Sequence, residues 1–112
     1  MNHSYGTIEG NFANNTKVLT ALLSTCRQYN LSVLDLIQHE FKPQGFTAVV
    51  LLAESHFSIH TYPESCELYT DLFCCNPDID TEECIKYLCD QLSGTILKVT
   101  TIRREKECCI LN

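Results

Sequence analysis

Hydrophobic and polar positions follow two different periods along the chain, and each period predicts one kind of element. Apolar residues recur at helical spacing in two segments, which end near Tyr29 and Leu92, and such a stripe is typical of an amphipathic helix. The stripes are Val18, Leu19, Leu22, Leu23 and Cys26, then Cys84, Ile85, Leu88, Cys89 and Leu92. Polar capping residues precede them at 14–16 and 80–81. We therefore expect two helices, the second ended by Gly94.

Strands are expected where apolar residues alternate with polar ones or form a short continuous run. The segments that meet this condition are 5–12, 31–41, 46–53, 56–62, 66–75 and 95–102. From the second segment, Leu34 and Leu36 are expected to face the core. Segment 46–53 is apolar almost throughout, which favours a central strand. In segment 56–62 one face should carry His56, Ser58, His60 and Tyr62, and the other Phe57, Ile59 and Thr61.

The order of these elements, β-α-β-β-β-β-α-β, predicts an α+β fold in a single domain that spans residues 1–112. Consecutive hairpins imply an antiparallel sheet, and the two amphipathic helices are expected to cover one of its faces. This arrangement is a two-layer sandwich whose second sheet face has no cover within the chain. Dimerisation would supply that cover, so we expect a homodimer.

Charge and cysteine content narrow the partners and the location. The chain has 14 acidic and 8 basic residues and a net charge of -6, so nucleic acid and anionic membranes are not expected as partners. The longest apolar stretch, 48–53, is too short to span a bilayer, and the first residues lack a signal-peptide pattern. We therefore expect a cytoplasmic protein whose 8 cysteines are reduced. The cysteine spacing does not match a zinc site, and no metal is expected.

The junction A-E-S-H at 53–56 contains none of the Gly, Asn or Asp residues that tight hairpin turns favour. Backbone strain at a polar residue is typical of functional sites. A serine in a distorted peptide offers one specific reaction, in which the Ser55 Oγ attacks the carbonyl of Glu54 and forms an ester by an N→O acyl shift. A base, His56 or His60, then removes the Ser55 α-proton. Elimination of the ester cuts the chain and leaves a pyruvoyl group.

Three stretches around this junction carry a resemblance to a known family. They are L-A-E-S-H-F-S-I-H-T-Y-P-E, the following D-L-F-C-C, and H-E-F-K-P-Q-G-F-T at 39–47. Together they closely resemble the short prokaryotic and archaeal type of self-processing, pyruvoyl-dependent S-adenosylmethionine decarboxylase. The likeness runs from His39 to Leu92, about half of the chain. The family fold has the same element order, with active sites at a dimer interface.

The resemblance implies a role for each matching residue. Cleavage would fall between Glu54 and Ser55 and give chains 1–54 and 55–112, with the pyruvoyl group, which forms a Schiff base with the substrate, at Ser55. The residues that would assist this chemistry are His60 in processing, Thr47 in support of processing, and Cys75 as the proton donor after CO2 leaves. Those that would hold the substrate are Glu64 at the ribose hydroxyls, Phe41 against the adenine, and Tyr62, where many relatives have Trp.

The function implied is decarboxylation of S-adenosylmethionine, which supplies the aminopropyl donor for spermidine and thus for polyamine biosynthesis. Two alternatives stay open. Arginine or ornithine decarboxylation can use the same pyruvoyl core, and a non-catalytic, nucleoside-binding or regulatory relative could share the fold. The chain departs from the family pattern at Tyr5, which stands where a His usually precedes the acid Glu9. It departs again at Asn76, where a Gly usually follows the cysteine.

Overall fold

A computed structural model describes residues 1–104 of the chain. Its helices and strands follow one another in the predicted order. Their bounds are β1 Asn2–Glu9, α1 Asn15–Gln28, β2 Val33–Glu40, β3 Phe46–Leu52, β4 Ser55–Tyr62, β5 Glu67–Cys74, α2 Thr81–Gln91 and β6 Thr95–Arg103. A single 3-10 turn, Pro63–Ser65, joins β4 to β5. The α+β class predicted from the sequence is therefore confirmed.

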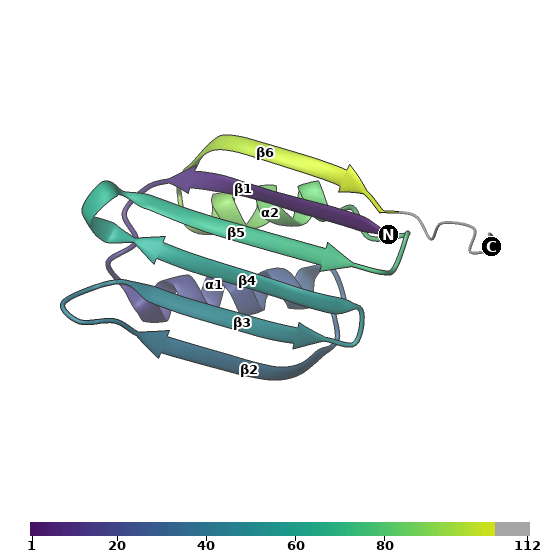
Figure 1. The fold of residues 1–112 in the computed structure, drawn as a ribbon, viewed down its shortest axis with the longest axis horizontal. Helices are drawn as coiled ribbons and strands as arrows, with labels where there is room; N and C mark the ends of the chain where they lie inside the picture. Colours follow the sequence, from purple (N-terminus) through teal and green to yellow (C-terminus); the bar gives the residue numbers. More distant parts are fainter. Residues whose placement is uncertain (105–112) are drawn as a thin grey trace, which may run out of the picture.

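The six strands form one sheet in the order β2-β3-β4-β5-β1-β6. Every neighbouring pair is antiparallel. Both helices lie on the same face of the sheet, α1 behind β3 and β4 and α2 behind β1 and β5 (Figure 1). The opposite face carries no element within residues 1–104, so the chain is a two-layer sandwich with one open side.

The core lies between the sheet and the helices, and it follows the predicted periods. In β3 and β4 the buried positions alternate with open ones, because successive side chains of a strand point to opposite faces. Phe57, Ile59 and Thr61 of β4 are buried as expected. Both helical stripes also reach the core, through Leu22 of α1 and Leu88 of α2 among others.

Two sequence expectations about strands are corrected. The first strand begins at Asn2, not at residue 5, because β1 pairs along its whole length with both β5 and β6. Leu34 was expected in the core, but it is 63% exposed. It lies in β2, the edge strand, where the pairing with β3 shifts between Val33 and Asp35. Such a bulge turns a side chain away from its regular face, and only Leu36 packs against the core.

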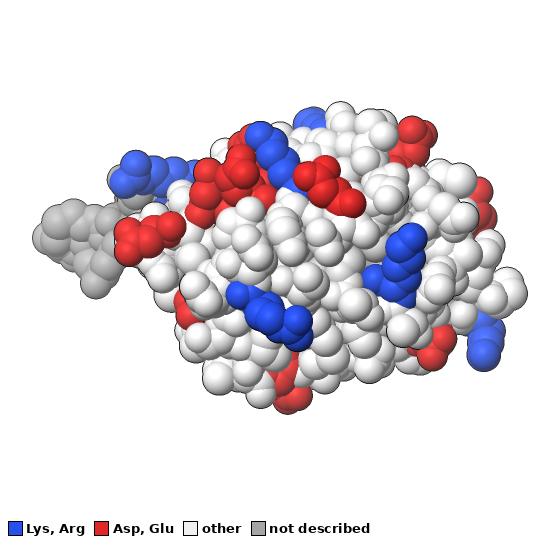
Figure 2. All heavy atoms as spheres, turned by 180° about the vertical axis from the view of Figure 1, so that it is seen from behind, with Lys and Arg blue, Asp and Glu red and all other residues white. Residues whose placement is uncertain are grey.

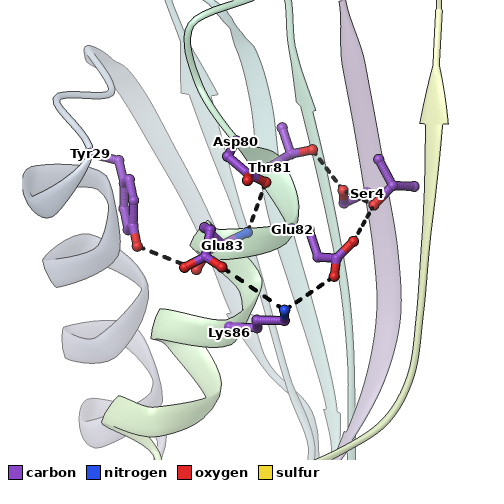
Figure 3. Close-up of polar contacts among 8 residues, drawn as sticks. Ser4, Tyr29, Asp80, Thr81, Glu82, Glu83 and Lys86 are labelled. Carbon is purple, nitrogen blue, oxygen red and sulfur yellow. Dashed lines mark hydrogen bonds and ion pairs between the residues drawn. The ribbon is translucent and has the colours of Figure 1, made fainter.

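Side chains cap both helices as the sequence predicted. The Asn14 side chain accepts a hydrogen bond from the Lys17 N–H at 3.0 Å, and Asp80 accepts one from the Glu83 N–H at 3.1 Å (Figure 3). Gly94 helps to end α2 as expected, because its N–H donates a hydrogen bond to the Cys89 carbonyl at 3.0 Å. The left-handed residue after α2 is Ser93, with φ of 53°, whereas a Cβ at Gly94 would lie 2.7 Å from Ile8. Gly94 is therefore needed for close packing against β1.

A cluster of three hydroxyls, of which those of Ser4 and Thr81 are buried, ties α2 to β1 and β6. The Ser4 Oγ lies 2.6 Å from the Thr81 Oγ1 (Figure 3). It also lies 2.7 Å from the Thr101 Oγ1. These contacts give partners to the buried hydroxyls of Ser4 and Thr81. They link β1, the start of α2 and β6 at the same end of the sandwich.

Charged side chains lie on the outer surface of the helix layer. Figure 2 shows acidic and basic side chains interspersed over a mostly uncharged surface. Lys86 of α2 lies 3.2 Å from Glu82 and 3.9 Å from Glu83, and such solvent-exposed pairs contribute little to stability. Within residues 1–104, none of the helices has the length and apolar content needed to cross a membrane.

Buried thiols make the fold sensitive to alkaline pH. Burial raises the pKa of Cys26 from 9.0 to about 11 and that of Cys84 from 9.0 to about 12. The unfolded chain therefore loses these protons at a lower pH than the folded chain. Above about pH 9 the unfolded chain binds fewer protons than the folded chain, so rising pH favours unfolding. We expect the free energy of unfolding to fall as pH rises from 9 to about 12. Urea unfolding at stepped pH measures it.

The matched variant for this prediction is Cys84→Ala. It lowers stability at every pH because it opens a cavity, but it should flatten the decline above pH 9. An equally steep decline in Cys84→Ala would mean that other groups cause the alkaline instability.

Candidate active site

The loop between β3 and β4 holds Ser55 in an unusual backbone conformation. Leu52 and Ser55 are cross-strand partners, so the loop consists of Ala53 and Glu54 alone. Ser55 has φ of 148°, a region that glycine enters readily and that costs another residue about 1–3 kcal/mol. The strain expected at this polar corner is therefore present, and it lies at the serine.

The end of β5 brings Cys75 beside the Glu54–Ser55 peptide. Ser55 pairs with Cys74 across the sheet, and the N–H of the next residue, Cys75, donates a hydrogen bond to the Glu54 carbonyl oxygen at 2.8 Å. Strand alternation separates the two thiols. Cys74 is fully buried, whereas the Cys75 thiol is exposed. The predicted proton donor is thus a free thiol next to the predicted cleavage point.

Two histidines and one aspartate lie near Ser55 on the open face of the sheet. Asp71 Oδ1 is 2.8 Å from the His3 Nε2 and 3.5 Å from the His56 Nε2. His56 follows Ser55 directly, so its ring is held near the strained peptide by a carboxylate from the neighbouring strand. The His56 and His3 rings both contact Phe73, with ring centroids 5.9 and 5.6 Å away.

The remaining predicted site residues form a second group at the other end of β4. The His60 Nδ1 lies 2.9 Å from the Thr47 Oγ1 across the β3–β4 pair. His60 and Thr47 border a cavity of about 450 Å³. Its other side chains are Phe41, Gln44, Thr61, Tyr62 and Glu64. The sequence expectation that Phe41, Tyr62 and Glu64 bind one ligand therefore agrees with a shared cavity.

The two groups are far apart within one chain. Ser55 and His60 are five residues apart on a straight strand, a separation of about 16 Å at ~3.3 Å per residue. Ser55, Cys75 and His56 lie at one end of β4. His60, Thr47, Glu64 and the cavity lie at the other, so a single chain does not bring its predicted processing histidine to its predicted cleavage point.

The open sheet face between the two groups is partly apolar. Cross-strand pairing aligns Ile37, Val49 and Ser58 in one row and Leu51, His56 and Phe73 in the next. Large apolar side chains that stay exposed on this face are Tyr5, Ile37, Val49, Leu51, Tyr62, Tyr69 and Ile102. A patch of this kind is typical of a surface that another protein covers.

The fold and the site together define a two-layer α+β protein with a strained serine beside a free thiol. Residues 3–105 match the S-adenosylmethionine decarboxylase family, and the chain belongs to that family. It is 38% identical over 86 residues to an S-adenosylmethionine decarboxylase proenzyme of Parasynechococcus marenigrum (strain WH8102), covering 77% of this chain and 67% of the relative. A proenzyme of the same name from Pyrococcus horikoshii is 31% identical over 88 residues, covering 79% of this chain and 63% of the relative.

A solved structure has the same fold. The crystal structure of the adenosylmethionine decarboxylase from Aquifex aeolicus VF5 superimposes with a TM-score of 0.73 at 26% identity, over 95% of this chain and 94% of that one. The resemblance inferred from the sequence motifs is therefore confirmed, and it extends well beyond residues 39–92.

Sequence reasoning missed three residues at this end of the sheet, of which Asp71 contacts His56, His3 contacts Asp71 and Ser32 contacts Glu54. Asp71 was part of the D-L-F-C-C motif but had no role assigned, and its pairing with two histidines depends on the register of β4, β5 and β1. His3 is distant from Ser55 in the sequence, and no motif around it indicated a place in the site. Ser32, in the loop before β2, contacts Glu54, and nothing in its sequence surroundings indicated this contact.

Proposed function

We propose that this protein is a self-processing decarboxylase of S-adenosylmethionine, made as a precursor that cuts itself between Glu54 and Ser55 into chains 1–54 and 55–112. The observation that carries the proposal is the geometry of that peptide. Ser55 has a strained φ of 148°, and the Glu54 carbonyl accepts a hydrogen bond from the Cys75 N–H at 2.8 Å. Membership of the decarboxylase family supports the same reading.

The cleavage begins at the Glu54 carbonyl. The Ser55 Oγ attacks its carbon, and the Cys75 N–H donates to the oxygen that gains negative charge. The C–N bond breaks, the amine takes the hydroxyl proton, and an ester joins the two halves. A base then removes the Ser55 α-proton, the Cβ–Oγ bond breaks, and Glu54 leaves as a carboxylate. The elimination leaves an enamine at residue 55, which becomes an imine when its Cβ takes up a proton. Water then replaces the imine nitrogen, ammonia is released, and a pyruvoyl group stands at the N-terminus of chain 55–112.

The residues around Ser55 fit this group and its chemistry. A pyruvoyl carbonyl supplies the electron sink for decarboxylation that pyridoxal phosphate provides in other enzymes. The exposed Cys75 thiol lies beside it and would return a proton to the substrate carbon after CO2 has left. The cavity at the other end of β4, lined by Phe41, Tyr62 and Glu64, offers an aromatic ring for a base and a carboxylate for ribose hydroxyls.

A homodimer would unite the two residue groups. In such a dimer the open faces of the two sheets would face each other, and the two-fold axis would lie between them, perpendicular to the strands. Rotation about this axis reverses the strand direction, so the Ser55 end of one β4 would lie over the Tyr62 end of the partner's β4. The apolar side chains of the open face would then be buried between sheets about 10 Å apart. Each site would combine Ser55 and Cys75 of one protomer with the partner's His60, Thr47, Phe41 and Glu64. A symmetric pair of this kind forms two equal sites.

Mixed dimers test this arrangement together with the cleavage. Ser55→Ala lacks the attacking hydroxyl and His60→Ala lacks the processing imidazole, so neither variant should cut itself alone. When the two are produced together, Ser55 of the His60→Ala chain meets the partner's His60. We therefore expect only the His60→Ala chain to be cut, which intact-mass spectrometry of differently tagged chains reveals.

The matched control replaces the Ser55→Ala partner with a Ser55→Ala/His60→Ala double variant, which should leave the His60→Ala chain whole. Cleavage in this control, or in His60→Ala alone, would show that His60 is not needed for self-cleavage. An uncut mixture of the two single variants would contradict a site shared between protomers.

The substrate is tested by CO2 release from S-adenosylmethionine, arginine and ornithine. The aromatic and carboxylate lining of the cavity favours a nucleoside-bearing substrate, so we expect release from S-adenosylmethionine alone. Release of CO2 from arginine or ornithine would show that the protein is a decarboxylase of that amino acid instead. The cytoplasmic location predicted from the sequence stays a prediction, which cell fractionation tests.

A further inference from the structure

The N–H, the hydroxyl and the carbonyl of Ser32 all form hydrogen bonds with the hairpin loop that precedes the proposed cleavage point. Its N–H donates to the Glu54 Oε1 at 3.0 Å and its Oγ to the Glu54 Oε2 at 3.2 Å. Its carbonyl accepts from the Ala53 N–H at 2.9 Å. Three hydrogen bonds therefore join one exposed loop residue to the two residues before Ser55.

The end of α1 fixes Ser32 in place. Asn30 reverses the chain with φ of 56°, and the Leu31 N–H donates to the Cys26 carbonyl at 2.8 Å. The Leu31 side chain is buried, so the residue before Ser32 is anchored in the core. Ser32 is thus a rigid point on the helix layer and not a mobile loop tip.

Glu54 is consequently held from two directions. Ser32 holds its carboxylate from the loop before β2, and the Cys75 N–H holds its carbonyl from the end of β5. An unfavourable φ such as that of Ser55 persists only where its surroundings impose it. Without the Ser32 contacts the loop could rotate about Glu54 and relax that strain.

We infer that Ser32 is a positioning residue for self-cleavage, which acts by clamping the Glu54 carboxylate. This inference rests on the proposed function. The clamp keeps the acyl half of the peptide where the Ser55 Oγ meets the Glu54 carbonyl carbon, and small displacements of reacting atoms slow such intramolecular steps severely. Ser32 acts only on the acyl shift and has no part in the later decarboxylation.

The rate of precursor cutting tests the clamp. Ser32→Ala removes the hydroxyl and keeps the N–H, so we expect cutting of freshly synthesised precursor to slow about tenfold, as the loss of one hydrogen bond to a charged group implies. Ser32→Thr restores the hydroxyl and should restore the rate. Ser93→Ala, in the exposed turn after α2, is the matched control and should cut like the parent chain.

Two further measurements separate positioning from general stability. In the uncuttable Ser55→Ala background, Ser32→Ala should lower the urea midpoint by no more than the loss of this one hydrogen bond implies; a much larger drop would make Ser32 merely structural. Hydroxylamine, which cleaves esters, should cut a His60→Ala precursor stalled at the ester but should not accelerate Ser32→Ala. Acceleration would place the defect after the acyl shift and overturn the inference.

The outcomes also distinguish this inference from the proposed function. If the parent chain is never cut at Glu54–Ser55, the proposed function itself fails. If the parent chain is cut and Ser32→Ala is cut at the same rate, only the clamp is wrong. After full cutting, kcat and KM of Ser32→Ala should equal those of the parent enzyme, and a changed kcat would contradict a role confined to cleavage.

Discussion

Ser55→Ala is expected to remain one uncut chain of 112 residues without decarboxylase activity. The variant keeps the hairpin and the Cys75 hydrogen bond to the Glu54 carbonyl, but it has no Oγ to attack that carbonyl. Neither the ester nor the pyruvoyl group can then form, so the loss should be complete. Intact-mass spectrometry after long incubation, together with CO2 release, measures both effects.

Ser24→Ala is a suitable control for this variant, because it removes a serine hydroxyl from α1, in the layer behind the sheet. It should be cut and active like the parent chain. Decarboxylation by uncut Ser55→Ala would show that the protein does not depend on a group made from this serine, and the proposed function would fall.

Cys75→Ala should separate cleavage from catalysis. Cleavage uses the backbone N–H of residue 75, which alanine retains, so the precursor should still be cut. Decarboxylation needs the thiol as proton donor, and loss of a positioned general acid typically costs a factor of about 10²–10⁴. We therefore expect kcat to fall by about that factor with little change in KM, measured by steady-state CO2 release.

Cys66→Ala serves as the matched control, since Cys66 is the other described cysteine with an exposed thiol. It should keep full activity. An unchanged kcat in Cys75→Ala would mean that another group, such as His56, protonates the product. Failure of Cys75→Ala to be cut would mean that the thiol itself takes part in processing.

Family membership and the element order could be predicted from the sequence because both depend on patterns among residues that are close together in the chain. Helical stripes, cap residues and strand alternation depend on spacing over a few residues, and the E-S-H-F-S-I-H-T-Y-P-E string is a continuous motif. The α+β class and the family were therefore predicted and confirmed. The individual site roles of Ser55, His60, Cys75 and Glu64 stay predictions.

Local patterns were less informative at the margins of the sheet. An apolar residue such as Leu34 suggests burial, but an edge strand with a bulge has no helix behind that position, and the residue stays exposed. The start of β1 was also misjudged, because its first residues join the sheet through partners near positions 74 and 103. Pairings of this range leave no periodic mark in the sequence.

The sequence by itself determined which reactive residues the chain has and which elements carry them, and it predicted a strained corner at Ser55 between two strands. Only the tertiary structure decided how these residues are grouped. The register of β4 against β3 and β5 places Ser55 beside Cys75 and sets His60 about 16 Å away. The loop after α1 places Ser32 against Glu54. Such groupings depend on contacts between segments that are distant in sequence, and spacing along the chain does not record them.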